Sequence, residues 1–295
     1  MIPQVSFIIS VFDQLDYTKR CLSCLEKTLK DKLTYEVLIV DDGSNEETIH
    51  YLHSLEEPHH VTFNSERKGF AKNNNLAASR AKGEYLCLLN NDVFVEGDWL
   101  LPMIKVLEEK ENVGVVGNVQ KLAFSNRFDH MGVVFGPLGN PRHYGQWFKD
   151  RKFRGEVKKW SAVTAACCLV RRKSFLELGG FDETYINGCE DVDLCLRFNR
   201  QQLFNYVVHD SVVLHVKGAS EGRKRFNDRN SEILLQQWGV EIRSQESVDD
   251  QLLHAKNYLY RGILRPFSTN FFKPSFSPLS LKKICRCSNV LKSSF

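Results

Sequence analysis

Two short polar segments follow apolar runs and carry side chains that could hold a nucleotide or a metal ion. Asn90, Asn91 and Asp92 come directly after one such run. A carboxylate held there is a hard oxygen ligand for Mg²⁺ or Mn²⁺ bound to phosphates. Asp41 and Asp42 end another run, where a carboxylate could accept a hydrogen bond from a nucleobase N–H. Tight turns also explain both segments, because Asn and Asp are common turn residues.

A dense acidic cluster later in the chain is a candidate for acid–base chemistry. Glu190, Asp191 and Asp193 follow Gly188 at the predicted start of a helix. The helix dipole accounts for one or two acids there, so three suggest that one has a chemical task. A carboxylate that acts as a base near neutral pH needs a raised pKa. The start of a helix lowers the pKa of a carboxylate, whereas desolvation by a bound substrate raises it. His215 ends a predicted strand, where it is either structural or a metal ligand.

The elements that must position these residues alternate between strand and helix in the first 120 residues. We predict strands over 5–10, 37–40, 61–63, 85–89 and 113–119, helices over 16–29, 71–81 and 99–109, and a further helix capped by Ser44 or Asn45. The strands are apolar on both faces, which is typical of a parallel sheet covered by helices on both sides. Ligands of such sheets bind beyond the carboxyl ends of the strands, where both polar segments fall.

The second part of the chain is less regular. Residues 121–160 are rich in Gly, Pro, Asn, Arg and aromatic residues without a clear period, which predicts a binding-loop region with short strands such as 132–135. Regular elements return as strands over 163–170, 205–208 and 212–216 and as helices over 173–178, 191–201 and 227–238. The acidic cluster is therefore expected at a helix start rather than at a strand end.

Composition is that of a folded protein and argues against several kinds of site. The 295 residues are 42% hydrophobic and 26% charged. Several of the nine cysteines lie in apolar runs, which predicts buried free thiols and no zinc site at Cys21 and Cys24. Neither a glycine-rich dinucleotide fingerprint nor a P-loop motif is present. The first residues lack a signal-peptide pattern and no run is long enough to span a membrane, so we predict a cytoplasmic protein.

Charge is distributed unevenly along the chain. The formal net charge is +4, but residues 251–295 contain eight Lys or Arg and no Asp or Glu, so the first 250 residues carry −4. An acidic body argues against nucleic acid as a partner. The basic tail also contains seven aromatic residues, a composition typical of an anchor at a membrane surface, here the inner face. Packing of the tail on the body, or disorder, explains it equally well.

Seven short motifs resemble those of the family 2 glycosyltransferases with the GT-A fold, and in particular those of bacterial rhamnosyltransferases. They are residues 5–13 (VSFIISVFD), 40–44 (VDDGS), 69–75 (GFAKNNN), 88–92 (LLNND), 179–183 (GGFDE), Glu190-Asp191 and His215. Each motif alone is weak, whereas their order and spacing together are specific to the family. The resemblance extends over about three quarters of the chain, from Val5 to Ser220.

The resemblance implies an α/β GT-A fold, which is a mixed, mostly parallel central sheet flanked by helices. A GT-A domain is expected over 1–222, with a nucleotide-sugar-binding half at 1–120 and an acceptor-binding half at 121–222. Residues 223–295 are then a C-terminal helical extension that ends in the basic aromatic tail.

The resemblance also implies a role for each matching residue. The nucleotide-sugar donor is expected to bind Ser10, Val11, Phe12, Asp42, Lys72, Asn73, Asn90 and Asn91. Asp92 and His215 are expected to hold Mn²⁺ or Mg²⁺, Asp191 to act as the general base, and Glu190 to steady the acceptor or the base. Asn90 stands where the family's metal motif usually has its first Asp, and Phe12 stands where a Tyr is usual.

These expectations describe one reaction and one alternative. The reaction moves a sugar, with inversion, from a UDP- or dTDP-linked donor to a hydroxyl of a glycan or lipid-linked acceptor in cell-surface polysaccharide synthesis. Asp191 would take the proton of that hydroxyl while the metal ion neutralises the leaving diphosphate. The alternative is a GT-A protein that binds nucleotide sugar or glycan without turnover, which Asn90 alone supports.

Overall fold

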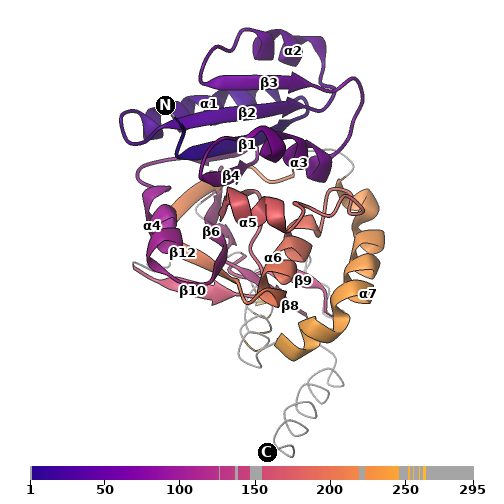
Figure 1. The fold of residues 1–295 in the computed structure, drawn as a ribbon. Helices are drawn as coiled ribbons and strands as arrows, with labels where there is room; N and C mark the ends of the chain where they lie inside the picture. The colour runs from indigo at the N-terminus through magenta and orange to yellow at the C-terminus, as the bar shows by residue number, and fades with distance from the viewer. Residues whose placement is uncertain are drawn as a thin grey trace, which may run out of the picture.

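A mixed ten-stranded sheet forms the centre of the computed structural model (Figure 1). The structure describes residues 2–125, 127–136, 139–146, 155–218 and 223–245, with five isolated positions between 252 and 263. The strands of this sheet are β1 (Val5–Val11), β2 (Tyr35–Asp41), β3 (His59–Phe63), β4 (Tyr85–Leu89), β5 (Val93–Val95), β6 (Val113–Leu122), β7 (Phe128–His130), β10 (Val157–Trp160), β11 (Cys167–Arg171) and β12 (Phe204–His215). A separate hairpin pairs β8 (Val133–Phe135) with β9 (Pro141–His143).

The order of strands across the sheet is β10-β12-β6-β11-β4-β1-β2-β3. The first four strands of the chain are mutually parallel, and β11 lies antiparallel between β4 and β6. β12 then runs parallel to β6, while β5 and β10 are antiparallel to β12. The predicted mixed sheet is therefore confirmed, with its parallel part at the N-terminal side.

Helices cover both faces of the sheet and enclose two buried apolar clusters. The helices are α1 (Leu15–Leu29), α2 (Glu46–His53), α3 (Phe70–Arg80), α4 (Leu101–Glu109), α5 (Arg172–Glu177), α6 (Glu190–Arg200) and α7 (Asn227–Gln245), with a short 3₁₀ turn over Arg223–Phe226. Alternate residues of each central strand enter opposite clusters, as Ile8 does on one face and Ile9 on the other. This alternation explains why the central strands are apolar throughout.

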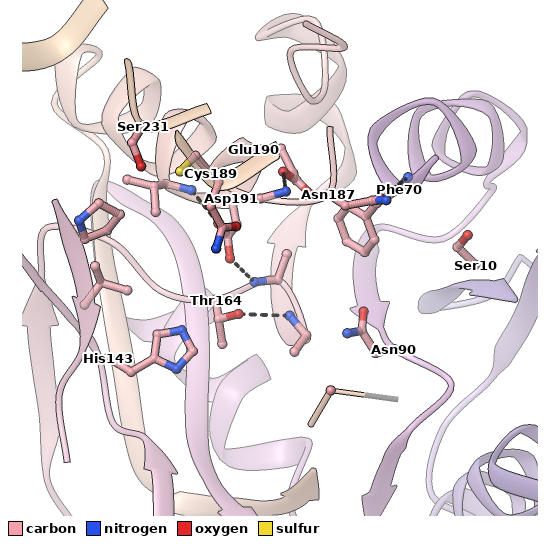
Figure 2. A pocket seen from close by; sticks show the side chains of 18 of the residues that line it. Ser10, Phe70, Asn90, His143, Thr164, Asn187, Cys189, Glu190, Asp191 and Ser231 are labelled. Carbon is pink, nitrogen blue, oxygen red and sulfur yellow. Dashed lines mark hydrogen bonds between the residues drawn. The ribbon is translucent and has the colours of Figure 1, made fainter. Parts of the chain in front are cut away.

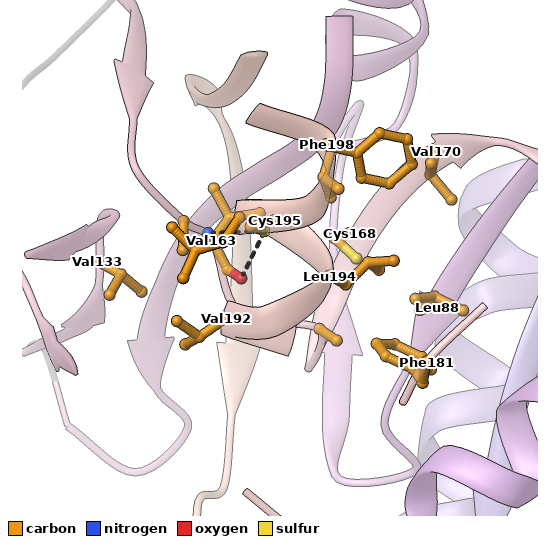
Figure 3. Packing of buried hydrophobic residues seen from close by; sticks show 14 of the residues in the cluster. Leu88, Val133, Val163, Cys168, Val170, Phe181, Val192, Leu194, Cys195 and Phe198 are labelled. Carbon is orange, nitrogen blue, oxygen red and sulfur yellow. Dashed lines mark hydrogen bonds between the residues drawn. The ribbon is translucent and has the colours of Figure 1, made fainter. Parts of the chain in front are cut away.

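One of these clusters holds α6 against the sheet. Figure 3 shows Leu194, Cys195 and Phe198 of α6 packed near Cys168 and Val170 of β11. Each of these side chains is nearly inaccessible to solvent, and burying such a side chain contributes about 1.5–3 kcal/mol. The position of the acidic first turn of α6 is thus fixed by an apolar core rather than by its charges.

The observed elements match most of those predicted, with two exceptions. The strands predicted over 205–208 and 212–216 are one strand, β12, whose register on β6 shifts between Val208 and Val212. The strand predicted over 163–170 begins at Cys167, because the preceding residues bond to other parts of the chain: Val133 N donates to Ala162 O, and Asn90 N donates to Ala166 O. The predicted cap of α2 is Asn45, whose side chain accepts from Thr48 N at 2.9 Å.

The helix α7 packs on the same core as α6. Leu234, Trp238 and Ile242 are buried in that cluster, and Trp238 Nε1 donates to Asp193 Oδ1 at 2.8 Å. Figure 1 shows α7 (orange) along one side of the molecule. The division of the chain after residue 222 stays a prediction, and most of the basic tail lies outside the described residues.

The cysteines that the structure describes are all free thiols, and five of these seven are buried, as predicted. Among the described residues, no helix combines the length and the apolar character needed to cross a membrane.

Candidate functional site

A cavity of about 1000 Å³ opens at the carboxyl ends of the parallel strands and extends to the first turn of α6 (Figure 2). The predicted residues that line it are Ser10, Phe12, Asp42, Asn90, Asn91, Asp92, Glu190, Asp191 and His215. They come from segments more than 200 residues apart in the chain. Strand topology explains the members predicted to bind the donor, because β1, β2 and β4 are parallel and end at the same edge.

Three of the residues predicted to bind the donor do not line this cavity. Val11 is fully buried in β1, and Lys72 is exposed on α3. Asn73 is buried, and its Nδ2 donates to Ser10 Oγ at 3.0 Å, so it fixes Ser10 from behind.

Asp92 and His215 meet as a buried pair, with Asp92 Oδ1 at 3.3 Å from His215 Nε2. Antiparallel pairing of β5 with β12 brings them together. Asp92 directly precedes Val93, the first residue of β5, and Val93 is opposite His215, the last residue of β12. Val216 N also donates to Asp92 O at 3.0 Å, which ties the two segments at this point.

The hydrogen bond on the other ring nitrogen decides what this pair can bind. His215 Nδ1 lies 3.1 Å from Gln120 Oε1, and with the amide oriented in this way Nδ1 must be the donor. In a neutral imidazole the lone pair is then on Nε2, facing the carboxylate of Asp92. Two electron-rich atoms at this separation are suited to a shared cation. The described residues contain no group of three or more His, Cys, Asp or Glu arranged for a metal ion, so further ligands must come from elsewhere.

The amides next to Asp92 are held by neighbouring elements. Asn91 Nδ2 donates to Thr18 Oγ1 of α1 at 3.0 Å. Asn90 N donates to Ala166 O at 2.9 Å, which joins this turn to the segment before β11. The side chain of Asn90 borders the cavity, as Figure 2 shows.

Asp42 organises the loop that leads into α3. Its carboxylate accepts from Lys68 N at 2.7 Å and from Gly69 N at 3.1 Å, and it is almost fully buried. The same loop brings the guanidinium of Arg67 to 3.7 Å from the centre of the Phe12 ring. Arg67 lines the cavity but was not among the predicted residues, because the sequence does not show which loop residue lies over Phe12.

The three acids of α6 have different surroundings. Glu190 Oε2 accepts from Gly188 N at 2.5 Å, so Glu190 closes the turn before the helix. Asp193 is buried away from the cavity, where it accepts from Arg197 Nε at 2.8 Å and from Trp238. Asp191 remains as the half-buried acid at the cavity, oriented by Ala165 N, which donates to its Oδ2 at 3.1 Å.

The turn before α6 is backbone-strained. Asn187 and Cys189 have φ of 51° and 72°, in the left-handed region that costs a residue with a side chain about 1–2 kcal/mol. Cys189 also borders the cavity, but burial, together with the nearby charges of Asp191 and Glu190, raises the pKa of its thiol to about 12. Its thiol is therefore neutral at physiological pH and a poor nucleophile.

A buried carboxylate, Asp129, lies behind His215. Burial opposes its ionisation, but the nearby charges of His143 and Lys217 and a hydrogen bond from Lys217 outweigh this, so the pKa of Asp129 is held below its ordinary value. Asp129 Oδ2 is also 3.9 Å from His215 Nδ1, so a carboxylate lies on that side of the ring. Asp129 was missed by the sequence analysis, since it lies in the irregular region where no period marks buried positions.

The rest of the cavity wall comes from the irregular region and from α7. The additional lining residues include Arg142, His143, Thr164, Asn187, Asn227, Asp228, Ser231, Glu232, Leu235 and Gln236. The prediction of a binding-loop region over 121–160 anticipated the first two. Nothing in the sequence distinguished the α7 residues from an ordinary solvated helix face.

Known proteins similar to this chain are bacterial polysaccharide enzymes and GT-A structures. The chain is 32% identical over 244 residues to the O-antigen biosynthesis protein RfbC of Myxococcus xanthus, covering 74% of this chain and 18% of that protein. It is 28% identical over 145 residues to rhamnosyltransferase WbbL of Escherichia coli K12, covering 44% of this chain and 54% of WbbL. The chain spans at most a quarter of the length of the first curated relatives that it matches.

The fold is shared with a solved glycosyltransferase. The crystal structure of GalNAc-T7 with UDP, GalNAc and Mn²⁺ superposes with a TM-score of 0.64 at 18% identity, covering 98% of this chain and 55% of that one. The family model for glycosyl transferase family 2 matches residues 6–179, which is more than half of the chain. On this match, the chain belongs to glycosyl transferase family 2.

Proposed function

We propose that this chain transfers a sugar from a nucleoside-diphosphate sugar to a hydroxyl group of a glycan or lipid-linked acceptor, in the synthesis of a cell-surface polysaccharide. The observation that carries the proposal is the convergence of Asp92, His215 and Asp191 on one cavity. The named relatives support the polysaccharide setting, since one takes part in O-antigen biosynthesis and another is a rhamnosyltransferase. A UDP- or dTDP-linked donor is our proposal for the nucleotide.

The donor lies at the edge of the parallel strands in this proposal. Phe12 and Arg67 offer a flat aromatic and a planar cation on which a nucleobase can stack. Ser10 and Asp42 line the same side and provide hydrogen-bonding groups. Asn73 acts through Ser10, and we keep Val11 and Lys72 as predictions that rest on the family resemblance alone.

The diphosphate lies next to Asp92 and His215, which would hold Mn²⁺ or Mg²⁺. When bound, such an ion supplies charge neutralisation for the leaving nucleoside diphosphate. Imidazole nitrogen and carboxylate oxygen are suitable ligands, and the 3.3 Å approach of two electron-rich atoms is a feature that a cation relieves. Diphosphate oxygens and water would complete the coordination. Asn90 stands where the family's metal motif usually has its first Asp, so the negative charge next to the ion is lower here.

Asp191 is the general base of this proposal. It faces the cavity from the start of α6, and two backbone N–H groups, those of Ala165 and Val192, fix the orientation of its carboxylate. Taking the proton of the acceptor hydroxyl as that oxygen attacks is worth about 10²–10⁴-fold in rate. A single displacement by that hydroxyl inverts the configuration at the sugar carbon. Glu190 holds the turn that presents Asp191.

A thermal-shift screen of UDP-, dTDP- and GDP-sugars with Mn²⁺, Mg²⁺ or EDTA tests the donor and metal assignments together. A ligand at 100 times its Kd stabilises the folded state by about 2.7 kcal/mol, which corresponds to several degrees in Tm. We expect one nucleotide class to raise Tm with metal and to lose most of the effect in EDTA. Equal shifts in EDTA would remove the metal from the proposal.

The alternative function, binding without turnover, keeps the same cavity and predicts the same thermal shift. Release of free nucleoside diphosphate from the selected donor distinguishes the two functions. Metal-dependent release supports an enzyme, whereas tight binding with no release under any acceptor condition supports the binding protein.

Membrane-surface attachment through the basic tail also stays a proposal, as does a cytoplasmic location. Most of the tail lies outside the described residues, so its composition is the support. Flotation with anionic liposomes, with and without residues 251–295, tests it. Equal recovery of the two proteins in the lipid fraction would reject it.

A further inference from the structure

One polar face of α7 borders the cavity that contains Asp191. The residues of this face recur at intervals of four along the helix and are Asn227, Asp228, Ser231, Glu232, Leu235 and Gln236. Residues at this spacing lie on the same side of an α-helix. Only Leu235 among them is apolar, so the face offers hydrogen-bonding groups to whatever occupies this side of the cavity.

The adjacent face of α7 fixes the helix against the turn that carries the proposed base. Asn230 is fully buried, accepts from Ile186 N at 3.2 Å and donates to Ile186 O at 2.8 Å. Tyr185 Oη donates to Gln237 Oε1 at 2.6 Å, and Trp238 bonds to Asp193 of α6. These contacts on both sides of residues 187–191 hold the polar face beside the turn that carries Asp191.

The two acids of this face are Asp228 and Glu232, and both are exposed on the helix. Asp228 and Glu232 are one helical turn apart, where like charges destabilise a helix by a few tenths of a kcal/mol. Asp228 lies in the first turn and benefits from the helix dipole, whereas Glu232 lies beyond it. The part of the chain that the structure describes gives neither carboxylate a hydrogen bond or an ion pair. Both carboxylates border the cavity and are therefore available to accept hydrogen bonds from a ligand there.

The β8–β9 hairpin meets this face at Leu235. Leu235 lies against Gly139, where an added Cβ would be only 2.6 Å from Leu235 Cδ2. Figure 2 shows Ser231 and His143 on one side of Asp191, with Ser10 and Asn90 on the other side. The α7 face thus belongs to the part of the cavity away from the donor residues, with the base between the two.

We infer that this face binds the terminal sugar of the acceptor and that this sugar is uncharged. The inference rests on the function proposed above and names its acceptor class. Hydroxyl groups of a sugar donate to the carboxylates of Asp228 and Glu232, and Leu235 contacts its apolar C–H surface. Two carboxylates repel an acidic sugar, since each would face a like charge. The bound sugar presents one of its hydroxyls to Asp191.

Transfer to soluble octyl glycosides tests this inference. The panel contains glycosides of a neutral hexose, a 6-deoxyhexose and an N-acetylhexosamine, together with the glucuronide, and the donor is the one selected by thermal shift. We expect transfer to a neutral glycoside and not to the glucuronide. Glu232→Gln and Asp228→Asn should each raise the KM for that glycoside by about tenfold or more, because each loses a hydrogen bond to a charged group.

Two further measurements separate the inference from the function on which it rests. Affinity for the nucleoside diphosphate with Mn²⁺ should be unchanged in both variants, because that ligand uses the other side of the cavity. The control is Glu108→Gln, the same chemical change at an exposed position of α4 outside the cavity, which should keep the wild-type KM.

Three results would overturn the inference. The first is an acceptor KM within twofold of wild type in both variants. The second is a preference for the glucuronide, whose carboxylate Arg142 of β9 could bind. The third is a protein that releases nucleotide from the donor but transfers no sugar to any neutral glycoside. Absence of metal-dependent nucleotide binding in the wild type would instead overturn the proposed function itself, and the inference with it.

Discussion

The two sides of the cavity are built in different ways. On the proposed donor side, Ser10, Asp42 and Asn90 follow strands of one parallel sheet, so their proximity is a consequence of topology. On the proposed acceptor side, Asp191 follows a strained turn and the remaining wall comes from a hairpin and from α7. The donor side therefore has the geometry shared by many nucleotide-binding sheets, whereas the acceptor side depends on contacts particular to this chain.

This difference separates a general part of the reaction from a specific one. A nucleoside diphosphate has nearly constant chemistry, which a rigid sheet edge can match. Acceptors differ in shape and hydroxyl pattern, and irregular segments can change without disturbing the sheet that carries them. Substitutions on the two sides should accordingly affect different measurements.

Asp191→Asn tests whether the acceptor side contains the base. The amide keeps the shape of the carboxylate but cannot take a proton, so transfer should fall by about 10²–10⁴-fold. Binding of the nucleoside diphosphate with Mn²⁺ should be retained. Asp98→Asn, at an exposed acid paired with Lys32, is the matched control and should keep full turnover. Near-normal turnover in Asp191→Asn would mean that the base is another group.

Trp238→Ala tests whether α7 is part of the folded core or a detachable extension. The side chain is buried and bonded to Asp193, so its removal should lower the free energy of unfolding by about 3–5 kcal/mol. Urea unfolding followed by circular dichroism measures this. Trp238→Phe keeps most of the ring but removes the indole N–H, so the carboxylate of Asp193 loses one hydrogen-bond donor. This variant should lower the free energy of unfolding by less, about 1–3 kcal/mol. A loss below 1 kcal/mol in Trp238→Ala would show that α7 is dispensable for the core.

Gln120→Leu tests the donor side through the bond that fixes His215. Without the amide oxygen, His215 Nδ1 has no acceptor at 3.1 Å and the ring loses its set orientation. Residues that support a metal ligand in this way are worth about 10–100-fold in metal affinity. Electron paramagnetic resonance titration of Mn²⁺ in the presence of nucleoside diphosphate measures the loss. Gln120→Glu keeps an oxygen acceptor and should recover most of the affinity, a recovery that a purely structural role does not predict.

Phe12→Ala tests nucleobase stacking on the donor side. An aromatic ring under a base contributes about 1–3 kcal/mol, so affinity for the nucleoside diphosphate should fall by roughly 5- to 150-fold. Isothermal titration with Mn²⁺ present gives this value. Phe12→Tyr restores the hydroxyl usual in the family and should bind at least as tightly as wild type. Unchanged affinity in Phe12→Ala would place the base away from Arg67 and Phe12.

Several sequence interpretations were limited by the same physical cause. Glu190, Asp191 and Asp193 are chemically similar and adjacent, and the sequence could not assign their tasks. Their different positions around the first turn of α6 point one acid to the cavity and another to the core, where Asp193 meets Trp238. The spacing of these three residues does not show how the helix is rotated relative to the cavity and to α7, which come from distant parts of the chain.

The sequence by itself determined the parallel strands and the polar residues at their carboxyl ends, which form the proposed donor side. Apolar strands followed by polar residues put Ser10, Asp42 and Asn90–Asp92 at one edge, since the carboxyl ends of parallel strands coincide. Tertiary structure alone decided which side chains face the cavity. It buried Val11, turned Lys72 outward, and brought Arg67, Asp129 and the polar face of α7 to the site. These positions depend on packing between segments far apart in the chain, which local periodicity does not record.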